Sequence, residues 1–245
     1  MMRLRKLLQG ASAVAVLAAA TAVPAQAQVR RVDSGTQAVG FNVGFFSVKG
    51  FDSRVDDDVL VADLSQGAFS LAFDPKDFSG ATFGGEWLIG LGDYLEAGIG
   101  AGFYQRTVPS LYDQKVRNDG SELEQDLKLR IIPFTGTVRF LPVGRGGVEP
   151  YVGAGIGAFN WRYSETGEFI DTEGFTFTDR FVASGTAVGP VILGGIRFPI
   201  GDVSTIGGEV RYQKAEGKGL LDKDFLGDKI DLGGWTTSLT FHLRF

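Results

Sequence analysis

The 245-residue chain contains no cysteine and only one histidine, His242. Without cysteine there is no disulfide, no thiolate nucleophile and no cysteine-ligated metal site. The presence of a single histidine also argues against a hydrolase that pairs histidine with serine or aspartate. Positive charge is scarce as well, because the formal net charge is −5. General nucleic-acid binding needs basic patches, so it is not expected here.

Long apolar runs are nearly missing too, and the one at the N-terminus has the pattern of an export signal. Arg3, Arg5 and Lys6 precede an uncharged apolar stretch, Ala11–Val23, and Ala25-Gln26-Ala27 has the form of a cleavage site. We therefore predict a secretory signal peptide over residues 1–28 and a single domain over residues 29–245. Loss of the three basic residues takes the net charge from −5 to −8. No other segment approaches the length of a transmembrane helix, so an integral protein would have to be a closed barrel.

Glycine is abundant, with 36 residues, and it recurs at alternate positions of strand-like runs such as residues 98–102 and 153–157. The clearest alternation is the last segment, Gly234–Phe245, which reads GWTTSLTFHLRF. Its apolar residues fall on one face and its polar residues on the other, which is the period of a strand. The segment has about the length that a tilted strand needs to cross a bilayer.

Eight segments show this alternation, at residues 37–49, 81–91, 95–106, 125–141, 148–163, 185–200, 204–213 and 232–245. Short turns alternate with long polar loops, predicted at residues 50–79, 107–124, 164–183 and 214–231. Two short turns, Gly92–Tyr94 and Gly201–Val203, are predicted to be three-residue loops. In the fourth segment the alternation changes phase at Pro133, which predicts a β-bulge there. The apolar part of the first loop, residues 59–73, fits a hairpin extension or a helix.

The closing strand and the segment GVEPYVGAGIG (Gly147–Gly157) resemble small Gram-negative outer-membrane β-barrels of the OmpA-like and OmpW-like type. The resemblance implies an all-β, eight-stranded antiparallel up-and-down transmembrane barrel in the outer membrane of a Gram-negative bacterium. It also implies that the barrel assembly machinery recognises Leu239, Phe241, Leu243 and Phe245. The expected partners are this machinery, outer-membrane lipid and lipopolysaccharide. We expect a monomer.

Charged residues of both signs fall on the face that would point into the barrel: Glu86, Glu96, Arg139, Glu149, Arg197, Glu209, Arg211 and Arg244. An eight-stranded barrel is just wide enough to be filled by side chains, and buried charges must be paired. We therefore predict an ion-pair network that fills the lumen, with a charged constriction of a narrow pore as the alternative. Pairing the fourth and fifth strands across Pro142–Gly147 predicts that Arg139 stands opposite Glu149. His242 is expected to be an interior polar filler.

No catalytic residue, cofactor or metal ligand is predicted. The run Asp56-Asp57-Asp58 lacks the spacing of a calcium loop and is expected to be a solvated acidic loop. The sequence favours a non-enzymatic barrel that acts through its extracellular loops, in envelope integrity or surface recognition. The alternative is an OmpW-like narrow channel for small apolar molecules, which Leu88, Tyr104, Tyr151, Phe159 and Trp161 would line. A soluble lipocalin-like barrel would require the opposite assignment of the two faces.

Overall fold

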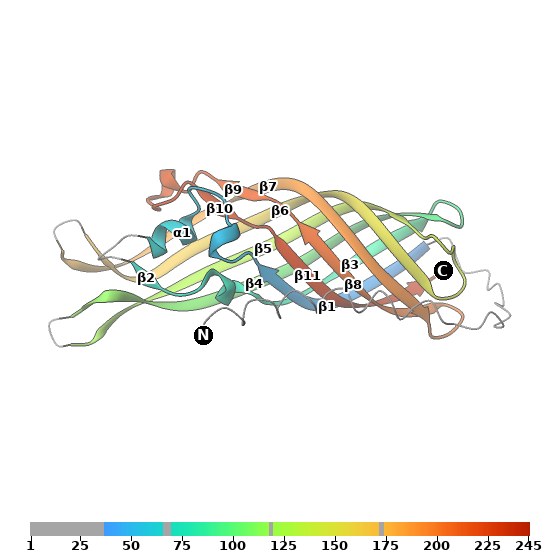
Figure 1. The fold of residues 1–245 in the computed structure, drawn as a ribbon, viewed down its shortest axis with the longest axis horizontal. Helices are drawn as coiled ribbons and strands as arrows, with labels where there is room; N and C mark the ends of the chain where they lie inside the picture. Colours follow the sequence, from blue (N-terminus) through green and yellow to red (C-terminus); the bar gives the residue numbers. More distant parts are fainter. Residues whose placement is uncertain (1–36, 66–69, 118–119, 172–173) are drawn as a thin grey trace, which may run out of the picture. The chain divides into compact units, whose positions relative to one another are not determined.

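The computed structural model describes residues 37–65, 70–117, 120–171 and 174–245, so the predicted signal peptide lies outside the described residues. Eight antiparallel strands form a closed ring, because the first strand pairs with the last, Phe41 opposite Phe241 (Figure 1). The predicted eight-stranded, all-β barrel is confirmed. The ring contains β1 (Gln37–Val48), β3 (Gly80–Gly90), β4 (Leu95–Val116), β5 (Glu122–Phe140), β6 (Glu149–Ile170), β7 (Thr176–Pro199), β8 (Ser204–Gln213) and β11 (Gly234–Arg244).

Each predicted strand segment overlaps one strand of the ring, and the two predicted three-residue loops are confirmed. The Leu91 amide donates to the Leu95 carbonyl at 2.8 Å, and the Ile200 amide donates to the Ser204 carbonyl at 2.9 Å. In the first of these loops Gly92 has a φ of +89°, a left-handed conformation that glycine adopts without steric cost. These short turns lie at the end of the barrel that carries the C-terminus (Figure 1).

At the opposite end, two segments that were predicted to be loops are strands. The predictions of loops over residues 107–124 and 164–183 are wrong, because β4 with β5 and β6 with β7 continue as paired hairpins. Leu111 stands opposite Glu124 in the first hairpin, and Glu168 stands opposite Thr178 in the second. Dense polar side chains gave these segments the composition of loops. The hydrogen bonds of a ladder join backbone groups, so they continue in polar sequence.

The predicted bulge at Pro133 is also wrong. Tyr104–Ile131 and Gly98–Thr137 belong to one unbroken register between β4 and β5, whose only shift lies between Leu111 and Val116. Odd-numbered residues of β5 face the interior throughout, and Leu129 and Ile131 are at most 2 % exposed. The alternation in the sequence changes phase because the two faces exchange character along the strand. From Pro133 towards the short turns the inner face is polar. From Pro133 towards the long hairpins the inner face is apolar.

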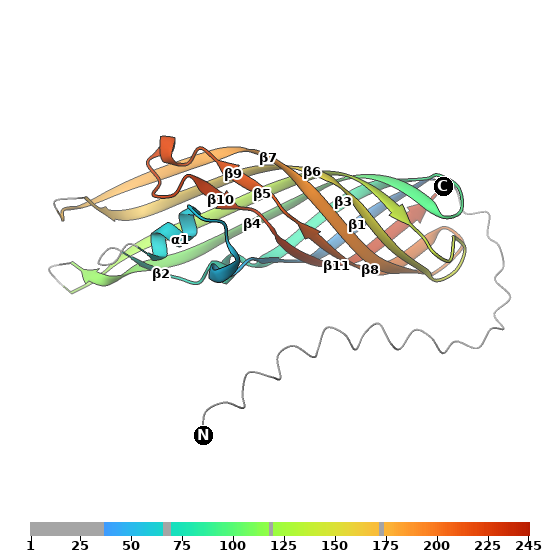
Figure 2. The ribbon, with the colours of Figure 1, turned by 45° about the horizontal axis from the view of Figure 1, so that its top comes forward.

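The segment between β1 and β3 folds over the end with the long hairpins (Figure 2). It contains two 3₁₀ helices, η2 (Phe51–Ser53) and η4 (Pro75–Phe78), the helix α1 (Val59–Leu64) and the short strand β2 (Leu71–Ala72). Residues 59–64 are therefore a helix, and the hairpin reading is wrong for them. No helix among the described residues is long and apolar enough to cross a membrane.

Asp58 caps α1, because its side chain accepts a hydrogen bond from the Leu60 amide at 3.0 Å. It also forms an ion pair with Arg54 at 2.9 Å and is fully buried. The expectation of a solvated acidic loop is therefore wrong for Asp58, although Asp56 and Asp57 are exposed.

The connection between β8 and β11 packs beside this segment. It forms a small hairpin from β9 (Glu216–Lys218) and β10 (Lys229–Asp231), with the 3₁₀ helix η5 (Leu221–Lys223) between them. Asp231 accepts from Lys49 at 2.8 Å, and its amide donates to Asp58 at 2.6 Å. The two connections, which we call the mouth segments, are thus tied together by charged hydrogen bonds at the mouth of the barrel.

Candidate functional site: the barrel interior

The outer surface of the ring carries a continuous apolar belt. On β5 the belt covers residues 132–140, about the length with which a tilted strand crosses a bilayer. Beyond it, the next outward positions on the four longest strands are Gln105, Arg130, Asn160 and Thr186. The exposed members of the belt include Val39, Phe41, Val43, Phe83, Trp87, Leu95, Ile99, Phe134, Val138, Phe140, Val152, Ile156, Val188, Ile192, Phe198, Ile206, Val210 and Leu239.

An exposed apolar belt with charges inside is the arrangement of a membrane barrel, so the soluble-barrel alternative is wrong for this half. Beyond the belt, towards the long hairpins, the polar residues face outward and the apolar residues face inward. Lys128 and Asp126 of β5 are exposed there, while Leu127 and Leu129 are fully buried. The half of the barrel with the long hairpins therefore has the polarity of a soluble barrel, because water surrounds it instead of lipid.

Within the belt, the interior contains a cluster of buried charges, which we call the lumen charge cluster. The eight charged residues predicted to point inward all lie in it. Two further residues join them: Arg145 and His242. His242 was predicted to be an interior polar filler, Arg145 was not predicted, and the structure places all ten within one set of ion pairs.

Arg139 of β5 lies at the centre of the cluster and is fully buried. Its guanidinium lies 2.5 Å from Glu86, 3.1 Å from Glu209 and 3.8 Å from Glu96. It also stacks over the ring of Tyr151, with 5.1 Å between the guanidinium carbon and the ring centroid. These three carboxylates come from β3, β8 and β4, so one side chain links four strands across the lumen.

A second group of pairs lies nearer the short turns. Arg197 contacts Glu96 at 3.1 Å and Glu149 at 3.5 Å, and Arg244 contacts Glu149 at 2.5 Å. The predicted pairing of Arg139 with Glu149 is wrong. Arg139 stands opposite Gly153 on β6 and Glu96 on β4, whereas Glu149 stands opposite Arg197.

The stagger of the barrel causes this difference. Phe140 and Val148 both face outward, as predicted, but Phe140 pairs with Val152. The first three residues of β6 therefore extend past the end of β5 and pair only with β7.

The sequence predicted the inward position of both His242 and Arg244 on the closing strand. His242 Nε2 lies 2.8 Å from a Glu86 oxygen. This contact gives the polar filler a specific partner. Arg145 carries no such signal, because it lies in the turn between β5 and β6. It folds back to 3.5 Å from Glu96.

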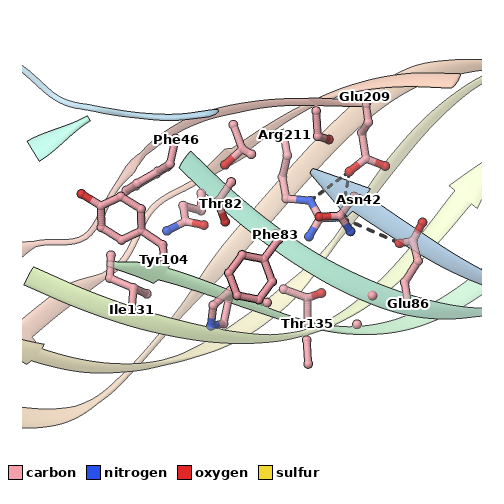
Figure 3. Close-up of a pocket in the computed structure, with 18 residues that line it drawn as sticks. Asn42, Phe46, Thr82, Phe83, Glu86, Tyr104, Ile131, Thr135, Glu209 and Arg211 are labelled. Carbon is pink, nitrogen blue, oxygen red and sulfur yellow. Dashed lines mark hydrogen bonds and ion pairs between the residues drawn. The ribbon is translucent and has the colours of Figure 1, made fainter. Parts of the chain in front are cut away.

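Above the charge cluster lies a small chamber of about 50 Å³. Figure 3 shows Arg211 reaching between Glu86 and Glu209 at one side, while Phe46, Tyr104 and Ile131 lie at the other. Arg211 is 2.8 Å from Glu209 and 3.8 Å from Glu86. The chamber has room for a few water molecules.

The other side of the chamber is closed by an apolar plug. The ring strands and the mouth segments both contribute to it, and its largest members are almost completely buried: Phe46, Leu60, Phe78, Tyr104, Leu127, Leu129, Ile131, Phe159, Trp161, Tyr163, Leu220, Phe225, Ile230 and Leu232. Tyr104, Phe159 and Trp161 thus belong to this packed cluster instead of lining an open path. Tyr151 lies in the charge cluster, and Leu88 is buried on β3.

Trp161 shows how closely the plug is packed. A Cβ added to Gly185 would lie 3.2 Å from its ring, and one added to Gly217 would lie 2.5 Å from it. Glycine at these two positions leaves the volume that the indole occupies.

The described residues contain no group of three or more His, Cys, Asp or Glu side chains that could hold a metal ion. The predicted assembly residues lie on the outer face of β11, where Leu239 is 66 % exposed, and Phe245 follows the strand. Their recognition during assembly stays a prediction.

No protein-family model matches this sequence, and no curated protein is similar to it. Solved structures are similar in fold. The outer membrane protein OprG from Pseudomonas aeruginosa has a TM-score of 0.50 at 14 % identity, with 86 % of this chain and 97 % of that chain covered. Neisserial surface protein A has a TM-score of 0.50 at 13 % identity, with 86 % and 99 % covered. This chain therefore has the fold of the small outer-membrane β-barrels.

The outer membrane protease OmpT of Escherichia coli is a more distant likeness, with a TM-score of 0.40 at 12 % identity. It covers 86 % of this chain and 94 % of its own. At that distance the likeness carries no argument about catalysis.

Proposed function

We propose that this protein is a non-enzymatic barrel of the Gram-negative outer membrane, with a closed lumen and a role carried by the extracellular part of the chain. The observation that carries the proposal is the double closure of the lumen. The lumen charge cluster blocks it within the belt, and the apolar plug blocks it above. Surface recognition or envelope integrity then depends on the hairpins β4–β5 and β6–β7 and on the mouth segments, which lie on the extracellular side by the usual orientation of such barrels.

The channel alternative requires a continuous path for an apolar solute. Of the residues that would line it, Tyr104, Phe159 and Trp161 fill the plug, and Tyr151 stacks against Arg139 in the charge cluster. Among the described residues, the space between the two seals is the small chamber. Vesicles that contain the refolded protein and a small apolar dye test this point. Release no faster than from empty vesicles is expected, and protein-dependent release would support the channel instead.

Lipopolysaccharide is the proposed partner at the rim of the belt. Arg130 and Arg162 stand directly opposite each other on β5 and β6, and their side chains point outward just above the belt. Like charges in this position repel each other, and neither forms an ion pair with another described residue. A phosphate between them would remove the repulsion, because arginine binds phosphate in a bidentate manner.

Binding of purified lipopolysaccharide to the refolded protein tests this proposal. The double change Arg130→Gln and Arg162→Gln should weaken binding at least tenfold, whereas Lys223→Gln, on η5 in the connection between β8 and β11, should leave it unchanged. Equal binding by both variants would contradict the assignment. We further propose that the protein is a monomer in the membrane and that the barrel assembly machinery recognises its C-terminal strand.

A further inference from the structure

A cavity of about 290 Å³ opens beside the apolar plug, between the two long hairpins and the mouth segments. This volume is just below the range of small-molecule sites, about 300–1,000 Å³. Its walls come from α1, β2, β4, β5, β6 and β7 and from the chain after η5. The cavity lies in the water-exposed half, beyond the apolar belt.

The lining of this cavity has one sign of charge. Asp63, Glu165, Asp171 and Asp224 line it, and no lysine, arginine or histidine is among the described residues that do. Asp63 is 2 % exposed and Glu165 is 7 % exposed. Two buried carboxyl groups without a cation beside them are costly, so the site is suited to a positively charged occupant.

Hydrogen bonding gives a second, independent indication. Asp63 Oδ2, Glu165 Oε1 and Gln125 Oε1 are buried and have no hydrogen-bond partner at normal distance among the described residues, and the buried Tyr163 hydroxyl is the donor beside the two carboxyl groups. The amide nitrogen of Gln125 donates to the Tyr112 hydroxyl at 2.9 Å and to the Glu168 carbonyl at 2.8 Å, so its oxygen is the group left over. One hydroxyl donor cannot satisfy three acceptors, whereas an ammonium group has three N–H donors and no acceptor.

The rest of the wall is aromatic. Phe169 packs edge-on against Phe181 with 4.7 Å between the ring centroids, and Phe177 lies 5.8 Å from Phe169. Phe225 lies 6.3 Å from Phe181. Aromatic faces attract cations and also cover apolar groups. A divalent metal fits less well, because calcium needs six to eight oxygen ligands and the described residues offer no metal-binding group.

From this geometry we propose that the cavity binds an organic ammonium ion with an apolar body. The ammonium group donates to Asp63, Glu165 and Gln125, and the apolar body lies against Phe169, Phe177 and Phe181. This site lies outside the two seals of the lumen, on the side of the long hairpins. Binding there therefore does not depend on whether the lumen is closed.

Burial supports the same site chemistry. It raises the pKa of Glu165 to about 7, and burial together with the neighbouring Glu165 raises the pKa of Asp63 well above its usual range. An empty site therefore holds a proton that a bound cation replaces, and binding should strengthen as the pH rises through about 7. The other titratable groups facing the pair are Tyr163, Tyr112, Asp58, Asp171 and Asp224.

Calorimetry on the full mature chain in maltoside micelles tests the proposal, with empty micelles as the blank. The probe is 2-phenylethylammonium, and its comparisons are 2-phenylethanol, 3-phenylpropanoate and calcium. We expect saturable 1:1 binding of the ammonium probe at pH 8. Binding should be at least tenfold weaker for the alcohol and undetectable for the carboxylate and for calcium. Affinity should fall about tenfold at pH 6, because one proton competes with the probe.

Glu165→Gln and Asp63→Asn should each weaken binding at least tenfold, while the exposed Asp126→Asn on β5 should leave it unchanged. Heat-dependent gel mobility shows whether each variant is folded. Equal affinity for the amine and the alcohol would mean partition into an apolar space and would overturn the proposal. Equal losses in the Asp126 and Glu165 variants, preferential calcium binding, or no binding by the folded wild type would also overturn it.

Discussion

Replacing Arg139 with methionine tests the lumen charge cluster most severely. Methionine keeps much of the apolar stem and removes the charge that contacts Glu86, Glu209 and Glu96. The Arg139 side chain is completely buried, so solvent does not screen these contacts. Breaking a buried ion pair by removing one partner costs about 3–5 kcal/mol.

The expected loss lies near the lower end of that range, about 3 kcal/mol. Glu209 keeps Arg211 at 2.8 Å, and Glu86 keeps His242 at 2.8 Å, so the carboxylates are not left without partners. Adding Glu86→Gln to Arg139→Met removes the negative charge of the carboxylate that Arg139 contacts most closely. The double variant should therefore recover about 1 kcal/mol or more relative to the sum of the single losses.

Urea titration of the protein in lipid vesicles, followed by tryptophan fluorescence, measures these free energies of unfolding. Lys128→Met is the matched control, because Lys128 lies on the same strand and is exposed above the belt. Its change should stay within about 0.5 kcal/mol. A similarly small loss for Arg139→Met, or strict additivity with Glu86→Gln, would refute a coupled buried network.

Four further outcomes are expected. Leu239→Arg places a charge in the apolar belt and should cost about 2–4 kcal/mol in the same titration if the position is near the midplane. Ser238→Arg points inward beside Glu209 and should cost less. A larger loss for Ser238→Arg would mean that the inward and outward faces of the strand have been assigned the wrong way round. Deleting Phe245 should lower the folded fraction recovered from outer membranes while leaving refolding of purified protein unchanged, and a normal yield in cells would contradict its role in assembly. Trp161→Ala should cost about 3–5 kcal/mol through the cavity left in the plug, and a loss below about 1 kcal/mol would mean that the plug is loosely packed. Because the pKa of Glu165 is raised in the folded state, stability should rise as the pH falls from about 7 towards 4.5, and Glu165→Gln should flatten that slope; an unchanged slope would contradict the raised pKa.

The ring of strands could be predicted from the sequence because each strand has an apolar face towards lipid and a polar face inside. That contrast sets the positions of β8 and β11 almost to the residue. The same rule failed at Pro133 of β5, where the surroundings change from lipid to water. When the alternation of side chains continues but the apolar and polar faces exchange character, the sequence looks the same as it would with a bulge. The two can be told apart only if the position of the membrane boundary is known.

The interior was predictable in membership and not in pairing. Parity alone puts Arg139 and Glu149 on the inward face, but the stagger between strands decides which residues meet. The acidic cavity was hidden for a different reason. Asp63 belongs to a mouth segment, and Glu165 belongs to a part of β6 with the composition of a loop, so only the folded chain brings them together.

Single-channel recording in planar bilayers tests the closed lumen most directly. The wild-type protein should show no steady conductance above the bare bilayer, because the charge cluster and the plug close the lumen in series. The plug variant Trp161→Ala should also stay closed, since the charge cluster remains intact. Steady channels of defined conductance in the folded wild-type protein would contradict the account and favour the narrow channel.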